Sequence, residues 1–158
     1  MEFVKVERPA DTNVIIGQSH FIKTAEDLYE IMAGSVPGAK FGIAFTEASG
    51  PCLIRTEGND DGLVRLSVTA LEALGAGHVF CIYLKNAFPI NVLNQIKNCP
   101  EVCRVFCATA NSLEVVVAAT PQGKGILGVI DGLSPKGVEG ADDRQQRRDM
   151  LRRFGYKR

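Results

Sequence analysis

The sequence predicts a single α+β domain, residues 1–158, in which two similar β-α-β-β units form mixed sheets covered by helices. Short apolar runs typical of strands alternate with stretches of helical periodicity. The same order of elements occurs twice, at about 13–57 and 78–120. A chain of 158 residues buries roughly 68–70% of its unfolded surface on folding, which is enough for one core without a metal or disulfide.

The first unit begins with an apolar run at Val14–Ile16 and continues into a helix that ends near Gly34. Thr24 and Asp27 have the spacing of a capping box, which predicts that the helix begins there. Two strand-like runs separated by a polar turn complete the unit: Lys40–Thr46 and Pro51–Thr56.

A second helix joins the units. Asp60 or Asp61 is expected to cap its start, a leucine-rich stripe forms its buried face, and Gly75 supplies the left-handed stop. Pro89 suits the first turn of the helix in the second unit. The strands expected in that unit are Val79–Leu84, Val102–Thr109 and Leu113–Thr120.

The C-terminal part contains a glycine motif and a charged helix. Gly123 to Gly128 match Gly-x-Gly-x-x-Gly, but Val129 and Ile130 continue a strand-like run, so a dinucleotide-binding turn is not expected. The helix at about 141–154 has acids at its start and arginines towards its end, as the helix dipole favours. We expect it to pack through three apolar side chains, Met150, Leu151 and Phe154.

Composition limits the classes of partner. The 18 Lys and Arg residues balance the 18 Asp and Glu residues, which disfavours a general attraction for nucleic acid. The apolar run Ala73–Leu84 has 12 residues, fewer than the roughly 20 that a membrane span needs. The first residues mix acids and bases, unlike a secretory signal. We therefore expect a cytoplasmic protein that binds neither nucleic acid nor membranes.

The five cysteines cannot all pair within one chain. Free thiols are therefore expected, with Cys103 and Cys107 on one buried face of a strand together with Val105. A redox role for Cys99 and Cys103 is a weaker alternative.

Both histidines lie where a strand meets a polar or glycine-rich segment. His20 stands between a strand and a helix start, where backbone N–H groups and Lys23 could hold an anion. His78 follows Gly75 and Gly77, which permit close approach to a phosphate. Either histidine could instead be an ordinary half-buried residue bonded to a carbonyl.

Further polar residues gather in the predicted turns. Glu47, Ser49 and Arg55 flank the hairpin of the first unit, while Asn86 and Asn91 lie in the second. Such side chains can bind a nucleobase, a ribose or a metal. Turn formation alone would also explain them. Asp131, between Ile130 and Gly132, is either a pocket carboxylate or a turn residue.

Long ordered blocks resemble the adenosine-specific kinase family of archaea and bacteria, over about residues 3–156. The blocks are Val14–Glu30, Lys40–Pro51, Gly75–His78, Asn86–Asn94 and Gly128–Glu139. The resemblance implies a small cytoplasmic homo-oligomer that binds adenosine or its nucleotides and is associated with phosphorylation of a histidine. We expect a closed assembly, a trimer or a hexamer, since uncovered sheet surface would then be buried.

With this resemblance, the sequence predicts phosphoryl transfer from ATP with Mg²⁺, with adenosine, AMP or ATP as ligands. His78 is the preferred acceptor over His20, Asp131 is the second catalytic residue, and Glu47 and Asp131 are candidate Mg²⁺ ligands. The predicted substrate-binding residues are Gly17, Gln18, Ser19, His20, Lys23, Glu47, Ser49, Arg55, Asn86 and Asn91. The alternative is a non-catalytic sensor or regulatory protein that binds adenosine or AMP.

Overall fold

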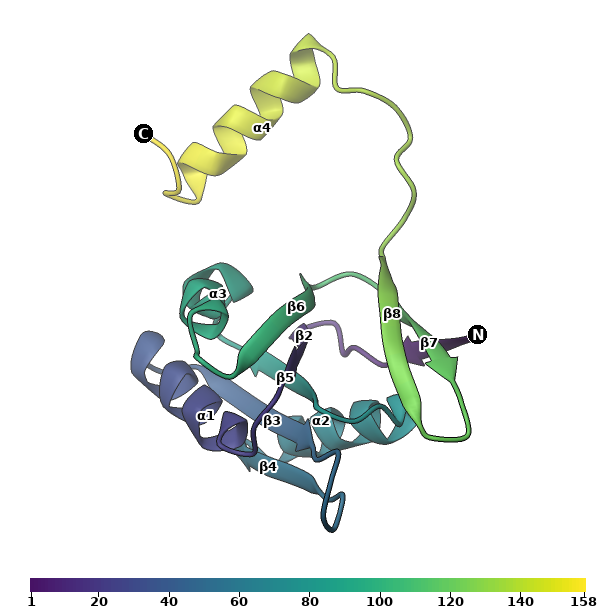
Figure 1. The fold of residues 1–158 in the computed structure, drawn as a ribbon. Helices are drawn as coiled ribbons and strands as arrows, with labels where there is room; N and C mark the ends of the chain where they lie inside the picture. The colour runs from purple at the N-terminus through teal and green to yellow at the C-terminus, as the bar shows by residue number, and fades with distance from the viewer.

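The computed structural model describes residues 1–158 and contains two antiparallel sheets and four helices (Figure 1). The five-stranded sheet has the order β4-β3-β5-β2-β6, and the three-stranded sheet has the order β1-β7-β8. The strands are β1 (Glu2–Val6), β2 (Asn13–Ser19), β3 (Lys40–Thr46), β4 (Ile54–Gly58), β5 (Val79–Lys85), β6 (Val102–Thr109), β7 (Leu113–Ala119) and β8 (Lys124–Asp131). The helices are α1 (Thr24–Ser35), α2 (Asp61–Leu74), α3 (Pro89–Lys97) and α4 (Ala141–Arg153).

The five-stranded sheet is built around the antiparallel pair β2 and β5, in which Ile15 lies opposite Ile82. Beside this pair, β3 lies next to β5 and β6 lies next to β2. The strand after α1 and the strand after α3 therefore each pair with the first strand of the other unit, and β3 also pairs with β4 of its own unit. Mixed sheets were predicted, but every pairing between these strands is antiparallel. The helix crossover does leave β2 and β3 parallel, yet β5 separates them.

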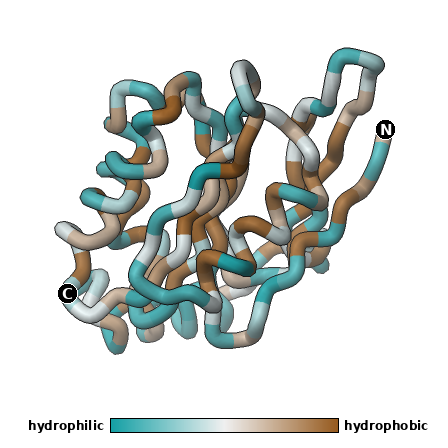
Figure 2. The backbone as a smooth tube through the Cα atoms, turned by 90° about the horizontal axis from the view of Figure 1, so that it is seen from below, coloured by the Kyte–Doolittle hydropathy of each residue, from teal (hydrophilic) through white to brown (hydrophobic).

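The five-stranded sheet is covered on both faces. Ile15 packs on the side of α1 and α3 with Leu28 and Val92, whereas Val14 and Ile16 pack with Leu71 of α2 and the inner face of the three-stranded sheet. Successive side chains of β2 thus pack into the cores on opposite faces of the sheet, because side chains alternate along a pleated strand. Hydrophobic positions are accordingly concentrated in the central strands (Figure 2).

Most helix ends lie where the sequence predicted them. Asp60 caps α2 by accepting a hydrogen bond from the Leu63 N–H (3.0 Å), and Gly75 ends that helix with φ 61°. Pro89 is the first residue of α3. The predicted cap at Thr24 is wrong, because α1 begins at Thr24 itself and the preceding residue makes no side-chain capping bond.

Two details of the strands differ from the prediction. Strand β1 was not predicted, and it forms one edge of the three-stranded sheet. Cys103 is exposed whereas Cys107 is buried, and Val105 packs against the opposite core from Cys107. A β-bulge in the pairing of β2 with β6 interrupts the alternation between these residues. All five thiols are free.

Helix α4 stands apart from the rest of the fold at the end of an extended segment (Figure 1). It contains no buried residue, and Met150 and Phe154 are 39% and 62% exposed. The predicted packing through its apolar side chains is therefore not made within one chain. Arg147 and Arg144 instead pair with Glu139 at its start. None of the helices combines the length and hydropathy that crossing a membrane would demand.

Candidate functional site

His78 lies at the end of the five-stranded sheet where β2 and β3 finish and β5 begins. Its N–H donates to the Thr46 carbonyl (2.8 Å), and its carbonyl accepts from the Ser19 N–H (3.0 Å). The ring is half-buried and stacks on Phe45, with the centroids 5.9 Å apart and the planes at 16°. Two neighbouring strands and one aromatic ring therefore fix the position of this histidine.

The backbone of His78 is left-handed, with φ 57°. This region is uncommon for residues other than glycine, although Asn, Asp and His adopt it several-fold more often than other side chains do. Its cost is of order 1–3 kcal/mol, which the surrounding structure must overcome, and such residues concentrate at functional sites. Thr46 supplies part of this support: its hydroxyl donates to the Ala76 carbonyl (2.8 Å) and accepts from the Val79 N–H (2.9 Å).

His20 lies at the same end of the sheet and is exposed. Its N–H donates to the Glu101 carbonyl (3.1 Å), and its ring stacks on Phe21 with centroids 6.4 Å apart. The preceding Ser19 hydroxyl is buried and hydrogen-bonded to the Thr24 hydroxyl at the start of α1. We call this end, defined by Ser19, His20, Thr46, Glu47 and His78, the histidine edge.

Other predicted ligands at the histidine edge already have structural roles. Lys23 pairs with Asp27 at 2.5 Å, and that bond raises the pKa of Lys23. A Cβ at Gly17 would lie 2.2 Å from Cζ of Phe80, so close packing requires this glycine. Gln18 is half-buried beside it.

Glu47 and Arg55 close the β3–β4 hairpin. Arg55 donates through Nε (2.9 Å) and Nη2 (2.7 Å) to Glu47 Oε1, and the Leu53 N–H donates to Oε2 (2.8 Å). The Leu53 N–H and the Arg55 guanidinium hold the pKa of Glu47 below its usual value. Both carboxylate oxygens are thus engaged by protein groups. Ser49 lies exposed at the tip of this loop.

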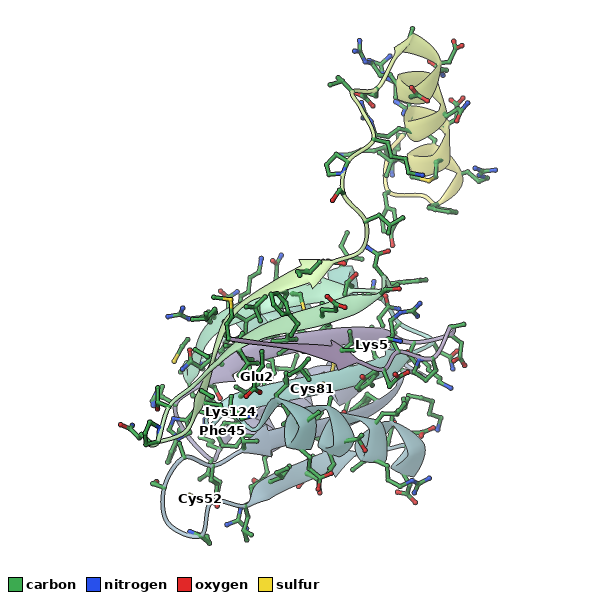
Figure 3. The ribbon with its side chains drawn as sticks, turned by 90° about the vertical axis from the view of Figure 1, so that its right-hand side faces the viewer. Glu2, Lys5, Phe45, Cys52, Cys81 and Lys124 are labelled. Carbon is green, nitrogen blue, oxygen red and sulfur yellow. The ribbon has the colours of Figure 1, made fainter.

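A hollow of about 610 Å³ borders the histidine edge on the α2 side. Gly77 is packed so closely there that a Cβ would lie 2.9 Å from Cβ of Ala48. Lys124 enters from β8 and pairs with Glu2 at 2.7 Å, at the same end of the molecule as Phe45 (Figure 3). The lining residues include Glu47, Ala48, Cys52, Gly75, Gly77, Gly123, Lys124 and Gly125. This glycine-lined hollow offers backbone close to the surface next to a cation.

The other three predicted residues lie at the opposite end of the sheet. Asp131 Oδ1 accepts hydrogen bonds from the Thr109 hydroxyl (2.6 Å) and from Asn111 Nδ2 (3.0 Å). Asn91 Oδ1 accepts from the N–H of the residue before α3 (2.9 Å), and Asn86 is left-handed with φ 56°.

A pocket of about 650 Å³ lies at this opposite end, between the body and the end of the C-terminal segment. Sequence reasoning missed its aromatic lining, because these residues come from distant elements. The lining includes Asn13, Phe88, Ile90, Thr109, Asn111, Asp131, Phe154 and Tyr156.

His78 and Asp131 are therefore separated by the length of β5. Gln18 pairs with Val79 beside His78, while Asn13 pairs with Leu84 at the other end. A seven-residue strand spans about 23 Å. A single chain thus does not bring Glu47 and Asp131 to one Mg²⁺ ion, nor His78 and Asp131 to one reacting group.

The sequence pattern of the family described as adenosine specific kinase matches residues 4–157. The chain belongs to this family. Among solved structures, it is similar to the PH1918 protein from Pyrococcus horikoshii OT3, whose crystal structure has a TM-score of 0.95 and 43% sequence identity. The alignment covers 99% of this chain and 97% of that chain. No curated protein sequence gives a significant match.

Membership in the adenosine-specific kinase family directs attention to the histidine edge. A kinase reaction needs a group that accepts the phosphoryl and donors that surround it. In this family member the edge has two histidines, the start of α1 and the glycine-lined hollow. The alignment with the PH1918 crystal structure covers 99% of this chain and therefore extends into α4.

Proposed function

We propose that this protein binds adenosine or an adenine nucleotide at the histidine edge and transfers a phosphoryl group through His78. The observation that carries the proposal is the restrained, left-handed backbone of a half-exposed histidine. Such a conformation persists only where neighbouring groups hold it, as Thr46 and Ser19 do here. A nucleophile held in one orientation loses little entropy on reaching its target.

In the proposed reaction, a neutral imidazole nitrogen of His78 attacks the terminal phosphorus of ATP. A P–N bond forms, the P–O bond to the β-phosphate breaks, and ADP leaves with the bonding electron pair. The 5′-hydroxyl of adenosine then attacks the same phosphorus, the P–N bond breaks, and AMP forms as the hydroxyl loses its proton.

The glycine-lined hollow is a suitable place for the phosphate chain of ATP. It begins at Gly77, one residue before His78, and it is lined by Lys124, whose ammonium pairs with Glu2. Backbone N–H groups and a lysine are typical partners of phosphate oxygens. Mg²⁺ accompanies ATP as part of the donor in this proposal. Because both oxygens of Glu47 are engaged, the ion would retain mostly phosphate and water ligands.

The test compares two histidine variants that are chosen to preserve the backbone conformation at each position. His78→Asn keeps a residue type that tolerates the left-handed region, and His20→Asn is its matched control at the same edge. After incubation with ATP and Mg²⁺ at mildly alkaline pH, intact-mass analysis should show one added phosphoryl group in the wild type and in His20→Asn. The adduct should be absent in His78→Asn. Its loss only in His20→Asn would reassign the acceptor, and its presence in both variants would refute both assignments.

Turnover separates this function from the alternative of an adenosine sensor. Steady production of AMP and ADP from adenosine and ATP supports a kinase, whereas saturable adenosine binding without turnover supports a sensor. Calorimetry should also show adenosine preferred over guanosine and cytidine. Equal affinity for all three nucleosides would reject the adenine assignment.

A further inference from the structure

Three potential metal-binding side chains meet beside the start of α1. They are Asp27 of α1, Cys99 of the α3–β6 turn and Glu101, which precedes β6. Their ligand atoms lie within 4.8 Å of one another. Cys99 and Glu101 are close in the sequence but Asp27 is more than seventy positions away, so the packing of α1 against the α3–β6 turn is what assembles the cluster.

Glu101 gives the cluster an unusual feature. The residue is only 3% exposed, and its Oε1 atom is buried without a hydrogen-bond partner. A buried carboxylate oxygen without a partner is costly, and buried charges in proteins are normally paired or coordinate a metal. Its backbone is well placed nevertheless, since its carbonyl accepts from His20 N–H (3.1 Å).

We propose that Asp27, Cys99 and Glu101 form a binding site for a divalent transition-metal ion, with Zn²⁺ as the best match. One thiolate and two carboxylates suit Zn²⁺, whereas Mg²⁺ and Ca²⁺ prefer oxygen ligands alone. Ligand atoms around tetrahedral zinc lie roughly 3.3–3.8 Å apart. The observed spacing of up to 4.8 Å closes to that range through side-chain movements of about 1 Å.

Lys23 is the protein group that competes for this position. Its ammonium pairs with Asp27 Oδ2 at 2.5 Å, but its side chain is 54% exposed and can turn into water. The ammonium has no hydrogen bond with Glu101, so it does not satisfy the buried oxygen. On metal binding, the Cys99 thiol loses its proton to solvent, a metal–sulfur bond forms and the ammonium of Lys23 moves away.

The fourth coordination position would face outward. A surface hollow of about 500 Å³ lies against the cluster, lined partly by Lys23, Asp27, Cys99 and Pro100. Three protein ligands and an accessible position for water are typical of zinc sites that bind a further ligand. The hydrogen bond from His20 to Glu101 links this site to the histidine edge, so an ion here would fix the segment that carries His20.

Calorimetry with Zn²⁺ on the metal-free full-length protein tests the site. We expect one equivalent to bind, with affinity reduced at least about tenfold in Glu101→Gln and in Cys99→Ser. The matched controls are Cys52→Ser and Cys103→Ser, which remove exposed thiols outside the cluster and should bind as the wild type does. Glu101→Gln preserves the shape of the side chain, and its melting temperature without metal verifies the fold.

Cobalt provides an independent readout of the sulfur ligand. With Co²⁺, the wild type and Cys52→Ser should show a thiolate-to-cobalt charge-transfer band that Cys99→Ser lacks. Absence of stoichiometric Zn²⁺ binding, or equal binding by the wild type, Glu101→Gln and Cys99→Ser, would overturn the proposal. The cluster would then be a carboxyl–carboxylate pair that shares a proton.

Discussion

The Thr46 hydroxyl accepts a hydrogen bond from the backbone N–H of Val79 at 2.9 Å, which ties the end of β3 to the residue after His78. The same hydroxyl donates to the Ala76 carbonyl, so one buried side chain spans the turn that carries the histidine. The restrained backbone of His78 therefore depends on a neighbouring strand as well as on its own sequence.

Replacing Thr46 with valine should loosen this turn. The Thr46→Val change keeps the volume but leaves a buried N–H and a buried carbonyl without the hydroxyl, which costs about 1–3 kcal/mol. Chemical unfolding should show this loss, and phosphorylation of His78 by ATP should slow. Thr56→Val, at an exposed position on β4, is the control and should change neither. A Thr46→Val protein with wild-type stability would show that the turn carrying His78 does not depend on the Thr46 hydroxyl.

Substitution by alanine should lower the stability of the fold at Gly17 and raise it at Gly34. A Cβ at Gly17 would overlap the Phe80 ring at 2.2 Å, and overpacking of this kind costs typically 1–3 kcal/mol. Nothing lies within 4 Å of a Cβ at Gly34 in α1, so Gly34→Ala should stabilise by about 0.5–1 kcal/mol. Thermal unfolding of both variants checks the pair. If Gly17→Ala has the same melting temperature as the wild type, the packing explanation for that glycine fails.

Local signals explain which parts of the fold the sequence predicts. Lys40–Thr46 and Val102–Thr109 agree with β3 and β6 because a strand pattern bounded by polar turns depends on few distant contacts. The face of Cys107 could not be predicted, because the bulge arises from pairing with β2. Strand β1 was missed for a related reason: its five residues gain their partner only when β7, more than a hundred positions away, lies beside them.

The candidate site was predicted only in part for the same reason. His78 and Glu47 come to one end of the sheet, and periodicity alone identifies neither that end nor the opposite position of Asp131. The order in which the strands pair determines which residues share an end of the sheet, and that order is set by tertiary packing. The cluster of Asp27, Cys99 and Glu101 had no motif, since its members approach one another only after α1 and the α3–β6 turn pack.

The Glu47 carboxylate should make stability depend on pH. Its pKa is lower in the folded state than its ordinary value of 4.5, through the Leu53 N–H first and Arg55 second. A lowered folded-state pKa stabilises the fold above the unfolded pKa, and this contribution is lost as pH falls through the folded pKa. The difference in melting temperature between wild type and Glu47→Gln should therefore be largest near pH 7 and shrink below about pH 4.5.

The control for this pH experiment is Glu30→Gln, at an exposed position on α1, which should melt nearly as the wild type does throughout. A constant difference between wild type and Glu47→Gln from pH 7 to pH 3 would contradict the assignment of the effect to ionisation.

The five thiols should divide into two reactive and three protected groups. Cys52 and Cys103 are exposed, whereas Cys81, Cys99 and Cys107 are buried. Burial raises the pKa of Cys107 to about 11 and raises those of Cys99 and Cys81 further. Because the thiolate is the reactive form, iodoacetamide at pH 8 should modify two cysteines per native chain and all five after unfolding. Peptide mass spectrometry identifies the sites, and rapid native labelling of Cys81 would refute the burial.

The last prediction concerns self-association. The outer face of the three-stranded sheet leaves Phe3 and Leu127 63% and 60% exposed, and α4 buries no residue within its own chain. A 13-residue helix is marginal in water without tertiary packing, so a second copy of the chain is expected to cover it. Light scattering should give a multiple of 17.1 kDa consistent with a trimer or hexamer, and the double change Met150→Lys with Leu151→Lys should lower that mass. Arg148→Lys, which preserves the charge on α4, is the control. Because the apolar face of α4 is what requires a partner, a monomer mass for the wild type at high concentration would show that the helix persists in water on its own.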